Sequence, residues 1–438
     1  MGKFLITITL AVALTASLSA QTVVQDNEYP DFYRPGRVTL DGATQWVKAI
    51  TVSVPALRSE VQGDVKFAFS APGMTHASVL CWQQPTADGD SPFGKDTHVC
   101  PEIALDADGE GTFVFPADKY PHGPLTVRIL AEDRGSRKKD VLEVQLFNQG
   151  GVKWRQGIPN ETPAGAEGLK LVFADDFDKE LSISADGANT TYCSHKPGPR
   201  NTDFSGWQFA DFEGALNPFS RVESWLRIHA SKRADGKASS GILAPVQARF
   251  DQAGNVRPSA AGEAGIMRVP FYVECRFLAQ SAPGTWPAFW TITDSSAGVG
   301  CTELDIIEAY GGFGKDNPNF TGYACTTHYW GQKGPDGKQL PGAHTNVDMF
   351  KIGGKSTWST TFHTYGLRVD EKDTVYYLDD VEVLRHPTDE QSKACPTFWM
   401  VNYSVGGISG WRIDLEREGN ATDMWVDYIR AYQGEKKE

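Results

Sequence analysis

The chain has 438 residues, a length that predicts two or three domains and is sufficient for a sizeable hydrophobic core. Its formal net charge is −13. An acidic surface repels other polyanions, so the charge argues against nucleic acid or an anionic membrane as the partner.

The first twenty residues predict a secretory signal peptide, 1–20. Lys3 precedes an apolar run from Phe4 to Leu14, and small residues follow up to Ala20. This segment is too short to span a membrane, and no cysteine follows it to accept a lipid. No later stretch is long and apolar enough to cross a bilayer. We therefore expect a protein without a membrane span that is secreted or periplasmic.

Seven cysteines remain, at spacings that match no metal-finger pattern. Export permits disulfides, but an odd count leaves at least one thiol free. Cys81 and Cys100 lie in one predicted domain and are a plausible pair. Cys275, Cys301 and Cys325 each lie on a predicted strand, where they also fit as small buried residues.

Residues 27–150 contain short strand-like runs separated by Asp-Gly and Pro-Gly turns, which predicts an immunoglobulin-like β-sandwich. The expected strands are Trp46–Val54, Val65–Ser70, Ala77–Gln83, Gly111–Phe115, Leu125–Glu132 and Val141–Phe147. Carbohydrate binding is one role for such a domain, but a spacer or docking module without catalytic groups is the simpler expectation. Residues 151–168 are rich in glycine and proline and are expected to form a linker.

From residue 169 to residue 435 the chain alternates strand-like segments with glycine and proline turns. No stretch of helical periodicity exceeds about two turns. The pattern predicts an all-β sandwich of two packed antiparallel sheets. Residues 181–202 and 331–342 lack strand character and are expected to be surface loops.

The stretch Cys301–Gly312 is predicted to be a β-strand that carries three carboxylates. Alternation places Glu303 and Asp305 on one face, with apolar residues pointing into a core. Simple alternation would bury Glu308 among those apolar residues, which is costly for a carboxylate without a partner. We therefore predict a β-bulge at Ile306-Ile307, which returns Glu308 to the face of the other two acids.

Such a strand supports a specific chemistry. Two carboxyl groups about 5–5.5 Å apart suit a retaining glycosidase, in which one is the nucleophile and the other the proton donor. A third acid between them would keep their pKa values apart, so that one is ionised and the other protonated. On this stretch alone, an acidic strand that faces solvent is the alternative interpretation.

The residues Glu303-Leu304-Asp305-Ile306-Ile307-Glu308 resemble the active-site signature of glycoside hydrolase family 16, in its β-bulge branch of laminarinases and agarases. Further segments resemble that family in the family's order, across roughly residues 168–435: 171–177, 272–277, 284–290, 327–330, 362–366, 376–380, 402–407 and 424–430. The resemblance implies that residues 169–435 form a β-jelly-roll catalytic domain. The whole chain is therefore expected to be all-β, with the N-terminal immunoglobulin-like β-sandwich followed by this jelly roll. An open substrate cleft would lie on its concave sheet, with residues 181–202 at the rim.

The resemblance also implies roles for individual residues. Glu303 would attack the anomeric carbon, Glu308 would protonate the leaving oxygen and then activate water, and Asp305 would tune and orient Glu303. No cofactor is expected to be required. Family members often carry a structural Ca²⁺ on the convex face, and Asp427 matches the residue that supplies its side-chain ligand.

Aromatic rings bind sugars because the apolar face of a pyranose stacks on a π-face. Among the tryptophans, Trp286 is the first candidate for the cleft and Trp330 and Trp411 follow. Strand parity places Trp399 on the core side and Asn402 on the cleft side.

Three more polar residues complete the expected substrate site. His328, next to the carboxylates, would hydrogen-bond the acid or the sugar. Glu274 and Arg276 share a face of one strand and match a pair that holds sugar hydroxyls in similar enzymes. Otherwise they would form a surface ion pair.

The resemblance implies an endo-acting retaining glycosidase that cleaves internal β-linkages of a polysaccharide, as a monomer with a glycan as its partner. The run Trp286–Trp290 is more similar to β-1,3-glucanases than to agarases. An endo-β-galactosidase acting on agar-type galactan or mucin O-glycans and a transglycosylase remain alternatives. A non-catalytic polysaccharide-binding lectin is the alternative from another class, and loss of one of the three acids would have favoured it.

Overall fold

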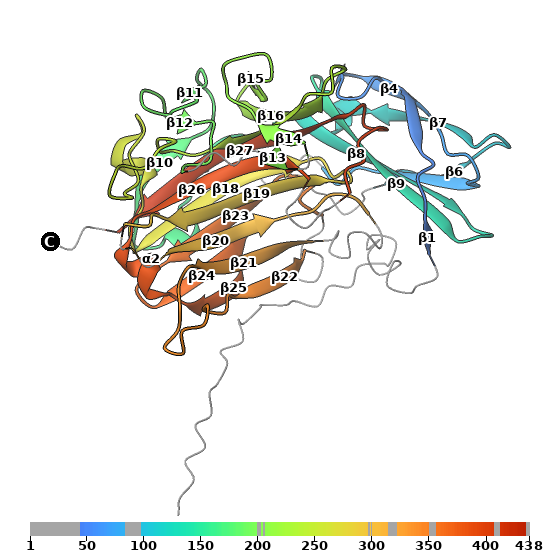
Figure 1. The fold of residues 1–438 in the computed structure, drawn as a ribbon. Helices are drawn as coiled ribbons and strands as arrows, with labels where there is room; N and C mark the ends of the chain where they lie inside the picture. Colours follow the sequence, from blue (N-terminus) through green and yellow to red (C-terminus); the bar gives the residue numbers. More distant parts are fainter. Residues whose placement is uncertain are drawn as a thin grey trace, which may run out of the picture.

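The computed structural model describes residues 44–83, 98–198, 203–204, 206–296, 298, 300–313, 322–349, 356–406 and 412–434. The expected signal peptide and Trp411 lie outside these residues. Figure 1 shows a smaller β-structure formed by the N-terminal part of the chain, packed beside a larger one formed by the rest. Within the described ranges, no helix combines the length and the apolar character needed to cross a membrane.

The N-terminal structure consists of two sheets that enclose their own core, which includes Phe67, Phe115, Val127 and Leu146. The larger sheet contains β1 (Gln45–Trp46), β3 (Glu60–Val61), β5 (His76–Leu80), β6 (His98–Ala104), β8 (Gly123–Asp133) and β9 (Lys138–Asn148). The smaller sheet contains β2 (Thr51–Val54), β4 (Asp64–Ser70) and β7 (Glu110–Pro116), and a 3₁₀ turn follows at Ala117–Lys119. The two-layered arrangement agrees with a sandwich, while the specific immunoglobulin-like assignment stays a prediction.

Two details of this domain differ from expectation. Strand β6 was not among the expected strands, and it contains Pro101, which lacks an amide hydrogen. The strand lies at the edge of its sheet, where a proline is tolerated. The pair Cys81–Cys100 does not form a disulfide, and all seven cysteines are free thiols.

The larger structure is a jelly-roll-like sandwich whose two layers are joined through β16 and β17. The layer that carries the acidic strand contains β13 (Asp203–Phe204), β14 (Trp207–Phe209), β17 (Ala238–Leu243), β19 (Thr285–Thr293), β20 (Cys301–Glu308), β21 (Gly322–Trp330), β22 (His344–Asp348) and β26 (Thr397–Val405). The opposite layer contains β10 (Lys170–Asp175), β15 (Phe219–Val222), β16 (Trp225–Lys232), β18 (Phe271–Ala279), β23 (His363–Val369), β24 (Asp373–Leu378), β25 (Val381–Pro387) and β27 (Ala421–Gln433). Short elements outside the layers are β11 (Ile183–Ser184), β12 (Tyr192–Cys193), α2 (Glu390–Ala394) and 3₁₀ turns at Ala164–Ala166 and Gly262–Gly265.

The core between the two layers explains which side chains face outward. Leu304 and Ile306 of β20 and Val273 and Cys275 of β18 all belong to one buried cluster. Trp399 is also in that cluster, as strand parity predicted. Because strand side chains alternate, the remaining residues of β20 and β18 point away from the core on opposite sides of the sandwich.

Residues 151–168, the expected linker, are fixed along the layer opposite the acidic strand, the layer that contains β18 and β27. The Trp154 side chain is buried, and the Gly157 amide donates to Asp427 Oδ1 at 2.9 Å. Arg430 Nη1 donates to the carbonyl oxygens of Pro159 and Glu161 at 3.1 and 3.0 Å. The expected domain boundaries themselves stay a prediction.

Candidate active site

The β-bulge in strand β20 is present where it was predicted. Asp305 pairs with Thr326 of β21, but Glu308 pairs with Ala324, so three steps along β20 correspond to two along its partner. The register on the β19 side shifts in the same interval. Ile306 and Ile307 are both buried. The extra residue restores the phase, and Glu303, Asp305 and Glu308 line one cavity.

This cavity has a volume of about 240 Å³ and is lined by residues of five strands (β14, β19, β20, β21 and β26) and one loop. It collects Glu303, Asp305, Glu308, Trp286 and Asn402, all of which the sequence placed there. The other lining residues are His328 and Trp330, also predicted, and Lys196, Phe209, Ala288, Trp290 and Ser404. Three acids, one lysine and three tryptophans therefore surround a space large enough for a sugar unit.

Glu308 has the properties of a general acid. Burial raises the pKa of Glu308 to about 7, and the negative charge of Glu303 acts in the same direction. Hydrogen bonds from Trp286 and Tyr310 stabilise the carboxylate and partly oppose this rise in pKa. A carboxyl group with such a pKa is substantially protonated at neutral pH and can donate a proton to a leaving oxygen.

Glu303 lies in a more cationic environment. Burial raises the pKa of Glu303, but the charges of Lys196 and His328 and a hydrogen bond from Trp330 favour its ionised form. The two glutamates therefore differ in their partners, and the cationic groups lie on the side of Glu303.

Asp305 is the most buried of the three acids, with a relative exposure of 4%. Burial raises the pKa of Asp305 well above its usual value, and the charges of Glu308 and Glu303 raise it further. His328 Nε2 lies 3.5 Å from Asp305 Oδ2. Burial and the two neighbouring glutamates therefore favour the protonated form of Asp305, and a neutral group at this position limits the repulsion between carboxylates.

Glu303, Asp305 and His328 present ligand atoms within 4.8 Å of one another, which is a geometry that could hold a metal ion. Lys196, however, lies close enough to lower the pKa values of both Glu303 and Asp305. A lysine ammonium at this position competes with a metal cation for the same carboxylates. The group therefore fits acid–base chemistry better than metal binding.

The aromatic side chains form two stacked pairs at the cavity. Trp286 stacks on Tyr310, with ring centroids 5.6 Å apart and an angle of 21° between planes. Trp330 stacks on His328 at 4.8 Å and 22° and remains 50% exposed. An exposed tryptophan at the edge of an acidic cavity offers a flat surface on which a sugar ring can stack.

Asn402 contributes to the cavity mainly by fixing a neighbour. Its Oδ1 accepts a hydrogen bond from Trp290 Nε1 at 2.8 Å, and its Nδ2 donates to Ser404 Oγ at 2.8 Å. Asn402 thereby orients the indole of Trp290, and Lys196 Nζ lies 5.2 Å from the centroid of that indole.

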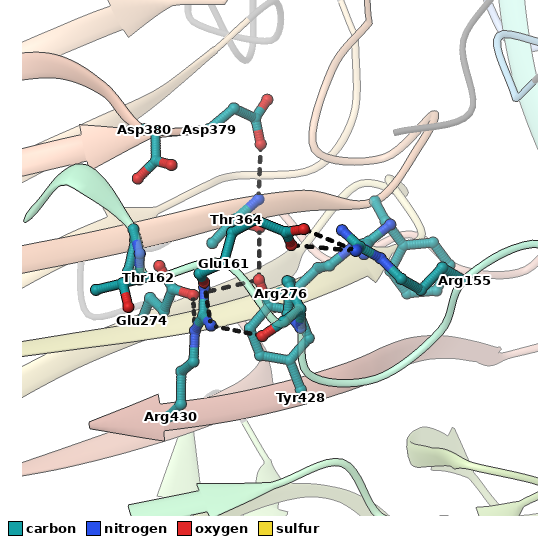
Figure 2. Close-up of a pocket in the computed structure, with 13 residues that line it drawn as sticks. Arg155, Glu161, Thr162, Glu274, Arg276, Thr364, Asp379, Asp380, Tyr428 and Arg430 are labelled. Atoms are coloured by element: carbon teal, nitrogen blue, oxygen red, sulfur yellow. Dashed lines mark hydrogen bonds and ion pairs between the residues drawn. The ribbon is translucent and has the colours of Figure 1, made fainter. Parts of the chain in front are cut away.

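Glu274 and Arg276, which were predicted to bind substrate, do not lie beside the carboxylates. Figure 2 shows that both residues line a separate cavity of about 320 Å³, on the layer opposite the acidic strand. Glu274 is buried and accepts hydrogen bonds from Tyr272 and Arg430. The Arg276 guanidinium lies 4.9 Å from the centroid of the Trp154 ring. Parity correctly put the two residues on one face of β18, but that face lies across the core from the acids.

The residues around Asp427 do not favour the expected calcium ion. Asp427 is fully buried, Oδ1 accepts the Gly157 amide, and Oδ2 lies 3.4 Å from Arg276 Nη1. Calcium takes six to eight oxygen ligands, whereas a guanidinium already provides positive charge at this carboxylate. A calcium ion held by Asp427 stays an untested prediction.

Lys196 and Tyr310 are two of the site residues that the sequence analysis did not identify. Lys196 comes from the 181–202 segment, which was expected at the rim but has no periodicity that could single out one residue. Tyr310 follows the acidic strand directly, and only the three-dimensional path of the turn brings it against Trp286.

The sequence of this chain is similar to those of known proteins. Residues 271–430 match the family model described as Glycosyl hydrolases family 16. Endo-1,3-1,4-beta-glycanase ExsH of Rhizobium meliloti is 28% identical over 218 residues, which cover 50% of this chain and 40% of that protein. Endo-1,3-1,4-beta-glycanase EglC of the same organism is 29% identical over the same length, with the same shares covered. This chain thus spans about two fifths of the length of these relatives.

Solved structures are also similar to this chain, at lower identity. LamAcat from Zobellia galactanivorans is 20% identical, with 61% of this chain and 100% of that chain covered and a TM-score of 0.44. SCLam, described as a non-specific endo-beta-1,3(4)-glucanase, is 21% identical, with 64% and 96% covered and a TM-score of 0.43.

Proposed function

We propose that the chain, whose residues 271–430 match the model of glycosyl hydrolase family 16, is an endo-acting glycoside hydrolase of the retaining type. The observation that carries the proposal is the cavity that holds Glu303, Asp305 and Glu308 together, with different partners on the two glutamates. All three acids are present, which argues against a non-catalytic lectin built on the same fold.

The proposed reaction has two displacements. Glu303 attacks the anomeric carbon as the glycosidic C–O bond breaks, and the leaving oxygen takes the proton from Glu308. Glu308, now a carboxylate, takes a proton from water, and that water attacks the anomeric carbon and frees Glu303. Lys196 and His328 favour the ionised form of Glu303 before attack. Asp305 stays neutral and separates the charges of the two glutamates.

The substrate that we propose is a β-1,3-linked or mixed-linkage glucan. The names of the curated relatives, endo-1,3-1,4-beta-glycanases, support this substrate class. The same names describe endo-acting enzymes, which supports cleavage within a long chain. We also propose that the protein is exported and acts as a monomer.

A panel of polysaccharides tests both the activity and the substrate class. We expect laminarin and lichenan to be cut to a ladder of intermediate oligosaccharides, which distinguishes internal from terminal cleavage. Agarose, porphyran, carrageenan and mucin O-glycans are the alternatives in the panel. Cleavage of only a galactan or a mucin glycan would keep the hydrolase and reject the glucan.

Glu303→Gln and Glu308→Gln are the matched controls for that panel, because each keeps the size of the side chain and removes its acid–base function. Both variants should fold, and both should lose at least about 10³-fold in turnover. Near-wild-type turnover by either folded variant would refute the assignment of that residue.

A further inference from the structure

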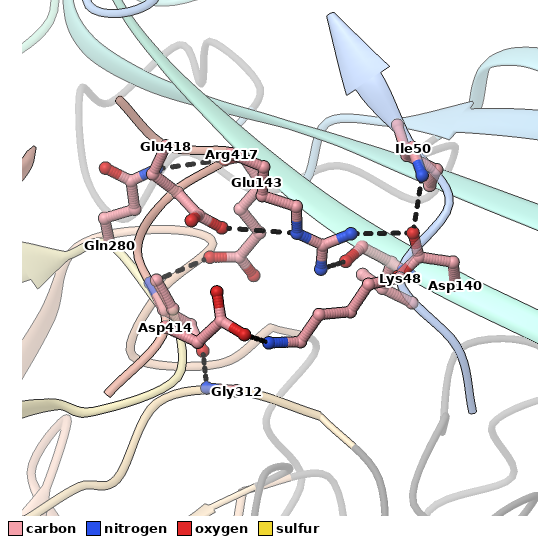
Figure 3. A network of polar contacts seen from close by, with 12 residues as sticks. Lys48, Ile50, Asp140, Glu143, Gln280, Gly312, Asp414, Arg417 and Glu418 are labelled. Atoms are coloured by element: carbon pink, nitrogen blue, oxygen red, sulfur yellow. Dashed lines mark hydrogen bonds and ion pairs between the residues drawn. The ribbon is translucent and has the colours of Figure 1, made fainter. Parts of the chain in front are cut away.

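The N-terminal sandwich and the jelly roll share a buried interface that contains charged groups. Phe147 of β9 packs with Trp225, Leu278 and Trp425 of the jelly roll in one hydrophobic cluster. Beside this cluster, Glu143 of β9 is 1% exposed and projects into the jelly roll, as Figure 3 shows. A buried carboxylate is costly unless it is paired, so its partners identify what it holds.

The partners of Glu143 come from both sides of the interface. Arg128 of β8 donates two hydrogen bonds to Glu143 Oε1, at 3.1 and 2.5 Å. From the jelly roll, Ser359 Oγ donates to Oε1 at 2.8 Å and the Ser281 amide donates to Oε2 at 3.1 Å. The Glu143 carbonyl oxygen also accepts Gln280 Nε2 at 3.0 Å. Glu143 therefore holds the Gln280 side chain and the Ser281 backbone amide of the jelly roll.

Ser281, which Glu143 holds in place, also binds the turn that follows the acidic strand. Its hydroxyl oxygen accepts the Gly312 amide at 3.0 Å. The neighbouring Gly311 approaches so closely that an added Cβ would lie 2.0 Å from Thr285 Oγ1. Arg128 reaches the same turn, with its guanidinium 5.1 Å from the centroid of the Phe313 ring. The turn is thus contacted at two successive residues. Ser281, which is bound to Glu143, accepts the Gly312 amide, and Arg128 lies over the Phe313 ring.

The held turn begins at Tyr310, which lies against the proposed acid. Tyr310 hydrogen-bonds Glu308 and stacks on Trp286. We propose that Glu143 is a positioning residue for the proposed general acid Glu308, acting through Ser281, the Gly312 amide and Tyr310, and that the N-terminal sandwich is thereby part of the catalytic apparatus. This inference rests on the proposed function.

The test uses the full-length chain with Glu143→Gln and Ser281→Ala. Gln keeps the size of the side chain but presents an amide to the Ser281 amide or to Arg128. Ala removes only the hydroxyl that accepts the Gly312 amide.

In both variants we expect kcat to fall roughly threefold to tenfold with little change in KM, because the acid is displaced while most substrate contacts remain. The alkaline limb of the pH–rate profile should move to higher pH, because the Tyr310 hydrogen bond that favours the Glu308 carboxylate is weakened.

Glu223→Gln is the control, since the pair between His122 Nε2 and Glu223 Oε2, at 2.7 Å, crosses the same interface without touching the turn. This variant should lower the melting temperature without moving the pH profile. In addition, Glu143→Gln should shift the profile no further when Tyr310→Phe is already present. Wild-type pH profiles in folded Glu143→Gln and Ser281→Ala would overturn the proposal, and so would an equal shift in Glu223→Gln.

Amide hydrogen exchange separates failure of this inference from failure of the proposed function, because it needs no substrate. Exchange in peptides that cover residues 309–313 should be faster in Ser281→Ala and Glu143→Gln than in Glu223→Gln. Unchanged exchange in the first two variants would overturn the proposal. Faster exchange in a protein that cleaves no polysaccharide would instead reject the proposed activity and leave only a constraint on the turn.

Discussion

The pKa of Glu308 depends on a few identified contacts. Burial and the charge of Glu303 raise it, and the hydrogen bonds of Trp286 and Tyr310 lower it, with a result of about 7. The sequence analysis predicted that two of the acids would differ in protonation, because a third acid lies between them. It could not predict Lys196 and Tyr310, which account for part of that difference, since both reach the acids from segments without strand periodicity.

Replacing Tyr310 by phenylalanine tests this balance. The proposed acid must be protonated, so kcat/KM should fall as pH rises through about 7 in the wild type. Tyr310→Phe removes a donor that stabilises the carboxylate, so the Glu308 pKa should rise and the alkaline limb should move to higher pH. Trp286 stacking should persist, because the ring is kept. A limb that stays in place or moves to lower pH in this variant would contradict the account.

The β-bulge of β20 shows what strand patterns can and cannot determine. It was predictable because alternation without it would place Glu308 in the core among Leu304 and Ile306, at a high cost in free energy. The same reasoning placed Glu274 and Arg276 on one face of β18 but could not tell which side of the sandwich that face belongs to. That information resides in the pairing of β18 with β27 and β23, which are distant in sequence.

Deleting Ile306 tests the bulge as an element. One residue fewer reverses the phase of the strand, so Glu308 should point into the core. We expect loss of detectable hydrolysis and a clearly lower melting temperature. Ile306→Val is the matched control, since it keeps the bulge and should cost only about 0.5–1.5 kcal/mol in the free energy of unfolding. A deletion variant that hydrolyses at the wild-type rate would refute the role of the bulge.

At the scale of the whole molecule, the two-part all-β architecture was predictable, and the tight association of the parts was not. The expected spacer domain and linker rested on composition, since residues 151–168 are rich in glycine and proline. The structure instead places Trp154 in a buried cluster and Glu143 inside the jelly roll. The contacts of Glu143 with the jelly roll have no local signature, because they join residues more than a hundred positions apart in the sequence.

Removal of the N-terminal sandwich tests this association. A protein that begins at Pro163 exposes Trp225 and Trp425, which are buried in the complete chain, and loses every contact of Glu143. We expect a melting temperature lower by several degrees, together with reduced turnover of short soluble oligosaccharides. A truncated protein with unchanged stability and unchanged turnover would restore the simpler interpretation of a spacer domain.

The central claim is that Glu303 and Glu308, brought to one face by the bulge, cleave a β-linked glycan by double displacement. Proton NMR of the first products, recorded on the polysaccharide that the panel identifies, tests this claim most directly. Two successive inversions at the anomeric carbon give net retention. Double displacement predicts that the β-anomer appears first and the α-anomer later by mutarotation. An α-anomer as the first product would contradict double displacement.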